Sequence, residues 1–253
     1  MRTYRVFYDG PLPDGAATIT LNEEESHHLT RVRRAAEGQP VAVVNGRGAL
    51  RKGVLARVEK REAVVELPGN GVTEAPPAVR FGLAPSLLPM GVFEELIPRS
   101  IELGASYFWP VEAERSVVSI PEKKLPARLG RWQGLARESL KQCERLWLPE
   151  IVPPAPVKTM LENCKRLGLI PVALLERSAQ TLSMERLPDS LAGRSCIFFV
   201  GPEGGWTDDE ARLLEEEALA VNLGPAILRA ETAAMAAMAF AMVHLGSRPD
   251  CSC

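Results

Sequence analysis

The stretch Gly201-Pro202-Glu203-Gly204-Gly205 directly follows the apolar run Cys196–Val200. An uninterrupted apolar run of this length is typical of a strand that is buried on both faces of a parallel sheet. Glycine costs roughly 0.5–1 kcal/mol relative to alanine inside a regular element, so three glycines in five residues predict a loop with close approaches that a side chain would forbid. Thr207 and Glu210 predict a helix that opens on a capping box. A tight strand-to-helix turn without a ligand remains the alternative.

A second unusual loop follows the short predicted strand Ala220–Leu223. It reads Leu223-Gly224-Pro225-Ala226-Ile227-Leu228-Arg229-Ala230-Glu231-Thr232-Ala233. A glycine turn, two apolar residues and an arginine come before a Glu-Thr pair that is expected to cap the helix Glu231–Leu245. That helix is rich in alanine, so another backbone can approach it closely. Its methionines at 235, 238 and 242 favour a core or a subunit interface over a cofactor site.

Strands alternate with helices from about residue 79 onward. The predicted strands are Val79–Leu83, Tyr107–Val111, Pro171–Leu175, Cys196–Val200 and Ala220–Leu223, and the predicted helices are Val92–Leu103, with a kink expected at Pro98, Pro126–Arg145, Val157–Leu167, Asp208–Ala218 and Glu231–Leu245. This alternation predicts a parallel α/β sheet covered on both faces. Ligands of such sheets bind beyond the carboxyl ends of the strands, which directs attention to the loops after Leu175, Val200 and Leu223.

The first 70 residues instead show short strands and turns, which predict a small closed β-barrel. The predicted strands are Tyr4–Tyr8, Ala17–Leu21, Pro40–Asn45, Gly53–Glu59 and Ala63–Leu67. A short helix is expected near Ser26, with Ser26 as its cap. Because Pro68–Pro77 is rich in proline and glycine, it is expected to be a linker. The expected domains are therefore 1–72 and 73–253.

Composition and charge narrow the class of protein. The chain has 253 residues, of which 46% are hydrophobic and 25% charged, as in ordinary folded proteins. Its net charge of −2 argues against indiscriminate coating of nucleic acid. Arg31, Arg33 and Arg34 nevertheless lie close together and permit phosphate contacts. A solvated charged face is an equally good interpretation of these arginines.

Patterns that the sequence lacks lead to expectations about the location of the protein and about bound metal. The longest apolar run, Ala233–Val243, is shorter than the roughly 20 residues of a membrane span, and the first residues have no apolar signal core. We therefore expect a cytoplasmic protein. Five scattered cysteines and three histidines give no disulfide framework and no zinc pattern, so we expect free thiols and no metal.

These motifs together resemble the SPOUT methyltransferases, and within them the bacterial 16S rRNA uridine-N3 methyltransferases of the small-subunit methyltransferase E type. The resemblance covers most of the chain, and its matching positions are His28, Arg31–Arg34, Gly38, Ser100–Gly104, Glu114-Arg115, Gln142, Arg145, Pro149–Ile151, Gly201–Gly205 and Leu223–Ala233. It implies a PUA-like barrel that binds RNA and a catalytic domain with a C-terminal trefoil knot. It also implies S-adenosylmethionine (SAM) as methyl donor, a homodimer, and 16S rRNA in the small ribosomal subunit as partner.

The resemblance also implies roles for individual residues. The cofactor would contact Leu175, Glu176, Val200, Gly201, Pro202, Glu203, Gly204, Gly205, Leu223, Gly224, Ile227, Leu228, Thr232 and Ala233, and RNA would contact His28, Arg31, Arg33, Arg34, Arg99, Arg115, Gln142 and Arg145. Arg229 would stabilise the uracil anion, and Glu231 would accept a proton or hold Arg229. A surface ion pair of Arg229 with Glu231, a capping role for Glu231 and a packing role for His28 are the alternatives.

Several basic positions that are usual in the family are changed here. The departures lie at Val92, Pro98-Arg99, Lys141, Leu146, Trp147, Ala226 and Ala230. Loss of cations that contact phosphate weakens RNA binding. Three other hypotheses therefore stay open: a methyltransferase with a different RNA site, a ribosome-binding relative without catalysis, and an α/β enzyme that acts on a small molecule.

Overall fold

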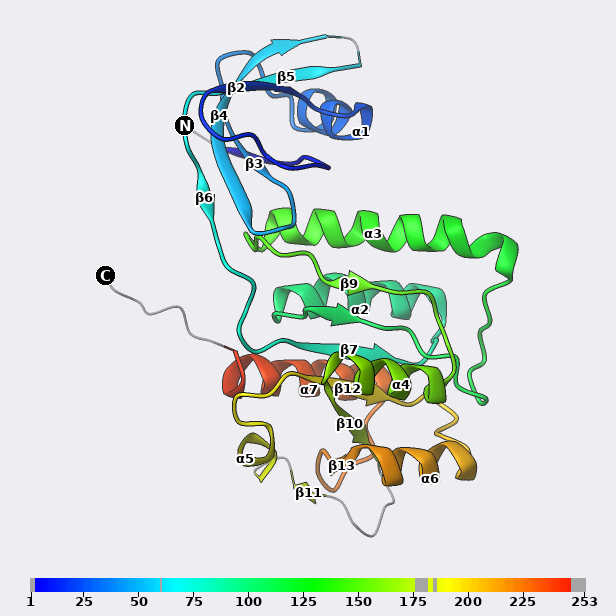
Figure 1. Ribbon diagram of the computed structural model, residues 1–253. Helices are drawn as coiled ribbons and strands as arrows, with labels where there is room; N and C mark the ends of the chain where they lie inside the picture. Colours follow the sequence, from blue (N-terminus) through cyan, green and yellow to red (C-terminus); the bar gives the residue numbers. More distant parts are fainter. Residues whose placement is uncertain (1–2, 60, 176–181, 184–185, 247–253) are drawn as a thin grey trace. The chain divides into compact units, whose positions relative to one another are not determined.

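In the computed structural model, the described residues are 3–59, 61–175, 182–183 and 186–246. The chain forms two compact units (Figure 1). The first comprises Met1–Pro76 together with Arg137–Leu148, and the second comprises Pro77–Ala136 together with Pro149–Cys253. The segment 137–148 thus groups with the N-terminal residues, although in sequence it lies far from them and within the predicted domain 73–253.

A six-stranded sheet forms the first unit, and its strands are β1 (Tyr4–Phe7), β2 (Ala17–Thr20), β3 (Pro40–Val44), β4 (Ala49–Val58), β5 (Ala63–Leu67) and β6 (Val72–Thr73). The strand order is β1-β3-β4-β5-β2, and β6 pairs with β4. Val6 of β1 and Ile19 of β2 share one apolar core although their strands end opposite sides of this order, so the sheet curls around that core. Strand β6 lies inside the predicted linker, which is therefore partly regular structure.

Helix α1 (Glu23–His27) continues into a single π-helical stretch, η1 (His28–Val32). Its cap is Asn22, whose side chain accepts the N–H of Glu25 at 2.9 Å, so the prediction of Ser26 as the cap is wrong. The helix begins after Asn22 because three glutamates follow it, and acidic side chains in the first turn stabilise a helix N-terminus. The Ser26 hydroxyl instead donates to the carbonyl of Leu21 and accepts the N–H of Ala63.

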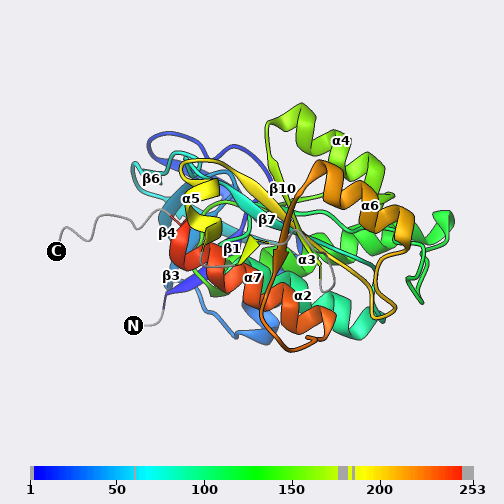
Figure 2. The same cartoon turned by 90° about the horizontal axis from the view of Figure 1, so that it is seen from below.

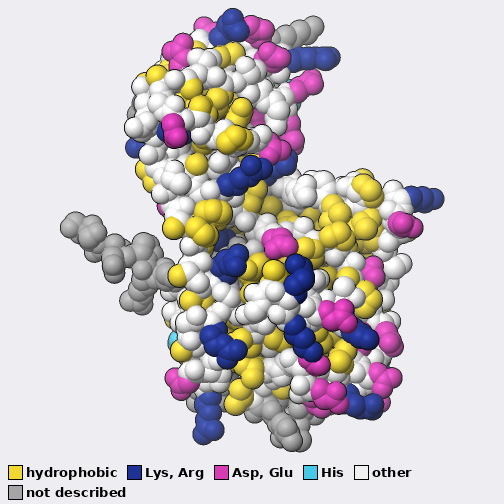
Figure 3. Space-filling model, viewed as in Figure 1, with side chains coloured by type: hydrophobic (Ala, Val, Ile, Leu, Met, Phe, Trp, Pro, Cys, Tyr) yellow, Lys and Arg dark blue, Asp and Glu magenta, His cyan; other side chains and the backbone are white. Residues whose placement is uncertain are grey.

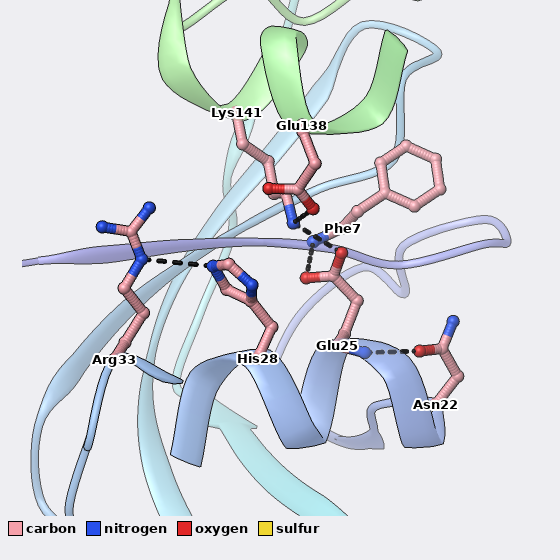
Figure 4. A network of polar contacts seen from close by, with 7 residues as sticks. All are labelled: Phe7, Asn22, Glu25, His28, Arg33, Glu138 and Lys141. Atoms are coloured by element: carbon pink, nitrogen blue, oxygen red, sulfur yellow. Dashed lines mark hydrogen bonds and ion pairs between the residues drawn. The ribbon is translucent and has the colours of Figure 1, made fainter. Parts of the chain in front are cut away.

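A buried charge network holds the segment 137–148 within the first unit (Figure 4). This segment includes the end of helix α3 (Leu125–Gln142). Lys141 Nζ lies 2.6 Å from Glu25 Oε1, and these side chains are only 7% and 8% exposed. Glu25 Oε2 also accepts the N–H of Phe7 at 3.0 Å, and Glu138 gives Lys141 a second carboxylate. Phe7 further packs with Val44, Leu140 and Leu146 in a small apolar cluster of this unit.

The second unit contains a seven-stranded sheet in which every pair of neighbouring strands is parallel. Its order is β11-β13-β10-β12-β7-β8-β9. The strands are β7 (Phe81–Pro85), β8 (Tyr107–Phe108), β9 (Glu150–Ile151), β10 (Ile170–Leu174), β11 (Leu182–Ser183), β12 (Cys196–Val200) and β13 (Leu219–Asn222). The other helical segments are α2 (Met90–Glu102), η2 (Glu122–Lys124), α4 (Val157–Leu167), α5 (Leu187–Leu191), α6 (Asp208–Glu217) and α7 (Ala230–His244).

Helices cover both faces of this sheet (Figures 1 and 2). α7 packs on β7, β12 and α2 on one face, and α4 and α6 pack on β10 on the other face. Phe199 and Ile197 of β12 lie in the core beneath α4 and α6, together with Met160 and Leu214 of those helices. The predicted parallel α/β sheet with two covered faces is confirmed.

Some predicted elements differ in extent. Strand β8 ends at Phe108, and Val111 makes only isolated bridges with Ser86 and Ala155. Helix α2 begins at Met90 and runs through Pro98. Its buried side chains, among them Phe93 and Ile97, offset the hydrogen bond that proline removes. In the described part of the chain, no helix is both long and apolar enough to cross a membrane.

The Lys141–Glu25 pair yields a test of this architecture. Replacing Lys141 with alanine leaves a buried carboxylate without its cation, so we expect the free energy of unfolding to fall by about 3–5 kcal/mol in urea denaturation. Replacement of both partners, as in Glu25→Gln with Lys141→Met, is expected to recover much of the loss. Lys158→Ala, at an exposed position of α4, serves as the control and should change stability by less than about 0.5 kcal/mol. Equal effects of Lys141→Ala and the control would contradict the role given to the network.

Candidate functional site

Three loops leave adjacent strands at the same edge of the parallel sheet. Strand β10 lies between β13 and β12, and the paired residues Val172↔Leu219 and Ala173↔Phe199 set the register. Because all three strands are parallel, their carboxyl ends meet, and the loops that follow Leu174, Val200 and Asn222 begin side by side. We call these three loops together the donor edge, because the family resemblance implies that they contact the methyl donor. The structure thus brings together the three segments that the sequence analysis singled out.

The first loop of the donor edge opens with Leu175. Its side chain is buried, and its N–H donates to the carbonyl of Val221 at 3.0 Å, so it extends the pairing of β10 with β13 by one residue. The predicted contact Glu176 lies outside the described residues. Leu175 therefore lies in the apolar core at the point where the chain leaves the sheet.

The second loop is shaped by glycines for two different reasons. Gly205 has a φ of +68° and closes a turn in which its N–H donates to the carbonyl of Pro202 at 2.9 Å. Gly201 needs space instead, because a Cβ there would lie 3.1 Å from Nε1 of Trp206. Pro202 is buried, whereas Glu203 and Gly204 are exposed. The loop is thus held by its own turn and by an indole ring folded over its first residue.

Trp206 also shapes the second loop, a role that the sequence did not predict. Its indole is partly buried and packs on the core beneath α4 and α6. The Nε1 atom is buried and has no hydrogen-bond partner among the described residues. The sequence signal was its position, one residue after the glycine-rich turn.

The start of α6 confirms the predicted capping box. Thr207 and Glu210 exchange side-chain and backbone hydrogen bonds at the helix N-terminus. Glu210 is buried, and its second carboxylate oxygen accepts the N–H of Glu114 at 3.0 Å. Arg115 donates from Nη1 to the carbonyl of Trp206 at 3.0 Å and, more weakly, to that of Gly204 at 3.5 Å. The predicted RNA contact Arg115 therefore lies against the second loop.

The third loop is largely exposed. Gly224 has a φ of +130°, and its N–H donates to the side chain of Asn222 at 2.7 Å. The Ile227 side chain is 72% exposed, which is unusual for a large apolar residue, and Leu223 and Leu228 are half-buried. An exposed apolar residue at the mouth of this edge is suited to cover an apolar part of a ligand.

Helix α7 begins one residue earlier than predicted. Arg229 is its N-cap with an extended backbone, Ala230 is its first residue, and Glu231 lies in its first turn. The prediction that Glu231 and Thr232 cap the helix is therefore wrong, because both are already helical. Arg229 is exposed, Glu231 is partly buried, Thr232 is exposed and the N–H of Ala233 donates to the carbonyl of Arg229. No ion pair joins Arg229 to Glu231, both of which the structure describes.

A fourth strand end, missed by the sequence analysis, adjoins the donor edge. Ser86 follows β7, the neighbour of β12, and its N–H donates to the carbonyl of Val200 at 2.8 Å. Ser86 is 1% exposed, and its Oγ has no hydrogen-bond partner within the described ranges. A single serine after a strand carries no sequence signal of its own. Only the strand order reveals its position.

The predicted RNA contacts of the first unit gather around η1. Arg31, Arg33 and Arg34 are exposed there, and Nε of Arg33 donates to Nε2 of His28 at 3.2 Å (Figure 4). Arg34 adopts a left-handed backbone with a φ of +55°. This arrangement places three guanidinium groups within one short turn of chain.

The other predicted RNA contacts differ in their exposure to solvent and in their ion pairing. In the segment 137–148, Gln142 is exposed, whereas burial lowers the pKa of the Arg145 guanidinium below its ordinary value. In the second unit, Arg99 pairs with Glu95 at 2.6 Å on the exposed side of α2. Figure 3 likewise shows Lys and Arg side chains interspersed with Asp and Glu over the visible face of the molecule. On the face that Figure 3 shows, basic groups therefore alternate with acidic ones.

Comparison with known proteins shows which family the chain resembles. Residues 76–242 match the RNA methyltransferase domain, and residues 21–67 match the RNA methyltransferase PUA domain. Ribosomal RNA small subunit methyltransferase E of Synechocystis is 32% identical over 88% of this chain and 72% of its own length.

Two solved structures resemble the whole chain. A putative methyltransferase of Legionella pneumophila, solved with its cofactor SAM, matches with a TM-score of 0.86 and 25% sequence identity. Ribosomal RNA small subunit methyltransferase E of Neisseria gonorrhoeae, solved bound to SAM, matches with a TM-score of 0.83 and 26% identity. Each match covers 96% of this chain and 98% of the other chain. Since a family model spans more than half of the chain and a relative of this similarity covers most of it, the protein belongs to the ribosomal RNA small subunit methyltransferase E family of RNA methyltransferases.

Proposed function

We propose that this enzyme transfers the methyl group of SAM to N3 of a uridine in the 16S rRNA of the small ribosomal subunit. The observation that carries the proposal is the meeting of three loops at the carboxyl ends of β13, β10 and β12, in a family with a relative solved bound to SAM. The substrate and the ring atom rest on the resemblance to uridine-N3 methyltransferases.

The donor edge has the chemical character that SAM requires. Adenine sites combine an apolar enclosure with backbone polar groups that fix orientation. Leu175, Val200 and the exposed Ile227 would supply apolar surface, and the left-handed turns at Gly205 and Gly224 would present backbone groups. The other residues proposed to contact SAM are Glu176, Gly201, Pro202, Glu203, Gly204, Leu223, Leu228, Thr232 and Ala233. When bound, SAM supplies a methyl group that its sulfonium has already activated.

The residues of the chain then have to position uracil and manage one proton. We assign Arg229 to the developing negative charge on the uracil ring, because its guanidinium is exposed beside the third loop and makes no capping hydrogen bond. The positive end of the α7 dipole acts in the same direction. Glu231, in the first turn of that helix and partly buried, is the proposed proton acceptor.

The first unit would hold the RNA. Exposed Arg31, Arg33 and Arg34 suit phosphate oxygens, because each guanidinium offers several donors. His28, Gln142 and Arg145 of the same unit, and Arg99 of the second unit, complete the proposed contacts. The partly buried Arg145 is suited to a fixed orientation more than to a freely moving contact.

Two further features implied by the resemblance belong to this proposal. The trefoil knot is compatible with a strand order in which β10 lies between the later strands β12 and β13. A homodimer is supported by α7, where Met242 and Val243 are exposed while Ala237 and Met238 are buried on the sheet side. A cytoplasmic location follows from the proposed partner, the ribosomal subunit.

A different RNA site is the second candidate, because several basic positions are changed. The structure accounts for three of these changes: Lys141 pairs with buried Glu25, Leu146 lies in the apolar cluster, and Trp147 packs against Gly48. These residues stabilise the first unit, so their presence is no sign of a new substrate. Val92, Pro98 and Ala226 remain without such an explanation.

The proposal predicts a specific nucleoside. Small subunits from a strain that lacks this gene, treated with the protein and SAM, should gain 3-methyluridine at one position of 16S rRNA, measured by mass spectrometry of nucleosides and of nuclease fragments. Subunits incubated without SAM are the control. A methylated nucleoside of another kind, or methylation of another RNA, would favour the second candidate, and no methylation at all would contradict the enzyme assignment.

The role of Arg229 predicts a separation of catalysis from donor binding. Arg229→Ala should lower kcat by about 10²–10³, as loss of one charge-stabilising donor does, while the Kd for SAM changes less than about threefold in calorimetry. Arg166→Ala, on the exposed side of α4, is a matched control and should retain full activity. A collapse of SAM affinity in Arg229→Ala would show that Arg229 holds the loop and does not act on uracil.

A further inference from the structure

The segment Ala113–Ser116 lies against the second loop of the donor edge and is joined to it at two points. The backbone N–H of Glu114 donates to Oε1 of buried Glu210 at 3.0 Å. The guanidinium of Arg115 donates to the carbonyl of Trp206 at 3.0 Å and approaches that of Gly204 at 3.5 Å. These contacts connect residues about 90 positions apart in the sequence. They restrain the turn from outside.

The stem of Arg115 also fits the backbone of the turn closely. A Cβ at Gly204 would lie 3.2 Å from Cβ of Arg115 and 3.3 Å from its carbonyl oxygen, which is tighter than most real contacts. Gly204 has an ordinary negative φ, so backbone strain does not explain its identity. A side chain at position 204 would therefore require the backbone at Arg115 to move by a few tenths of an ångström. Gly204 thus permits the close approach of the backbone at 115, and the hydrogen bonds of the guanidinium are what make the arginine side chain specific.

Glu210 makes the same connection through the helix that follows. One of its carboxylate oxygens accepts the N–H of Thr207 at 3.0 Å within the capping box, and the other accepts the N–H of Glu114. The turn Gly201–Trp206 therefore enters α6 through a cap that the segment 113–116 shares. A buried carboxylate that satisfies two backbone donors is a rigid joint.

We propose that Arg115 is a positioning residue of the methyl-donor site, which sets the conformation of Gly201–Trp206 through the carbonyls of Trp206 and Gly204. This inference rests on the proposed function, since it assumes that this turn binds SAM. It reassigns a residue that the sequence suggested as an RNA contact. Loss of Arg115 lowers the affinity for SAM and leaves the affinity for RNA unchanged.

The side-chain chemistry predicts which substitutions matter. Guanidinium presents several N–H donors in a fixed plane and can serve two carbonyl oxygens at once, whereas the lysine ammonium is a compact point charge. Arg115→Lys therefore keeps the charge that a phosphate would require but loses the planar geometry. The two substitutions together separate charge from geometry.

The test measures SAM affinity by calorimetry and steady-state kinetics with SAM and with unmethylated small subunits, using the full chain. For Arg115→Ala we expect the Kd for SAM to rise about tenfold, as for loss of a charge-assisted hydrogen bond that is partly screened, and the KM for subunits to stay within about twofold. Arg115→Lys should recover the loss only in part. Arg212→Ala, an exposed arginine of α6 paired with Asp209, is the control and should equal the wild type.

Other outcomes overturn the inference in distinct ways. Unchanged SAM affinity in Arg115→Ala, with a raised KM for subunits and a salt slope reduced by about one, would make Arg115 a phosphate contact. Full recovery by Arg115→Lys would show that charge alone matters. A wild-type protein that binds no SAM would overturn the proposed function as well, whereas wild-type binding that Arg115→Ala leaves intact would overturn only the role of Arg115. If Arg115→Ala does not fold, Arg115→Lys carries the test: a raised Kd for SAM supports the positioning role, and a wild-type Kd overturns it.

Discussion

The parallel pairing of four neighbouring strands is the constraint on which the site depends. Because β13, β10, β12 and β7 all run in the same direction, residues far apart in the chain arrive at one edge with their loops adjacent. Backbone hydrogen bonds fix this register, and apolar side chains on both faces make any slip costly. Leu175, Gly201 and Ser86 are neighbours for this reason, and no local preference of their own would bring them together.

The loops at this edge are then shaped by contacts that lie outside them. Gly201 accommodates the Trp206 indole, Gly204 accommodates Arg115, and only Gly205 requires its left-handed backbone. Glycine-rich loops are often described as flexible, but here two of three glycines permit close packing that restrains the loop. A restrained loop loses less conformational entropy when a ligand binds, which favours affinity.

Periodicity and apolar runs predicted the parallel sheet, its two covered faces and the loops of the donor edge, because a buried strand such as Cys196–Val200 is recognisable locally. The capping box at Thr207 and Glu210 was equally local. The pairing of Lys141 with Glu25, the approach of Arg115 to Gly204 and the place of Ser86 could not be predicted in this way, since each depends on contacts over long sequence separations. The start of α7 was misjudged by one residue because Glu231-Thr232 looks like a cap, whereas the extended backbone of Arg229 takes that position.

We propose that the carboxyl edge of β13, β10 and β12 is the SAM site. Amide hydrogen exchange with and without saturating SAM tests it most directly, because a bound ligand slows the exchange of the backbone that it orders. We expect slower exchange in Val200–Trp206 and Leu223–Arg229, with no change in β3, β4 and β5 of the first unit. Slower exchange elsewhere in the chain, with both loops unaffected by SAM, would contradict it.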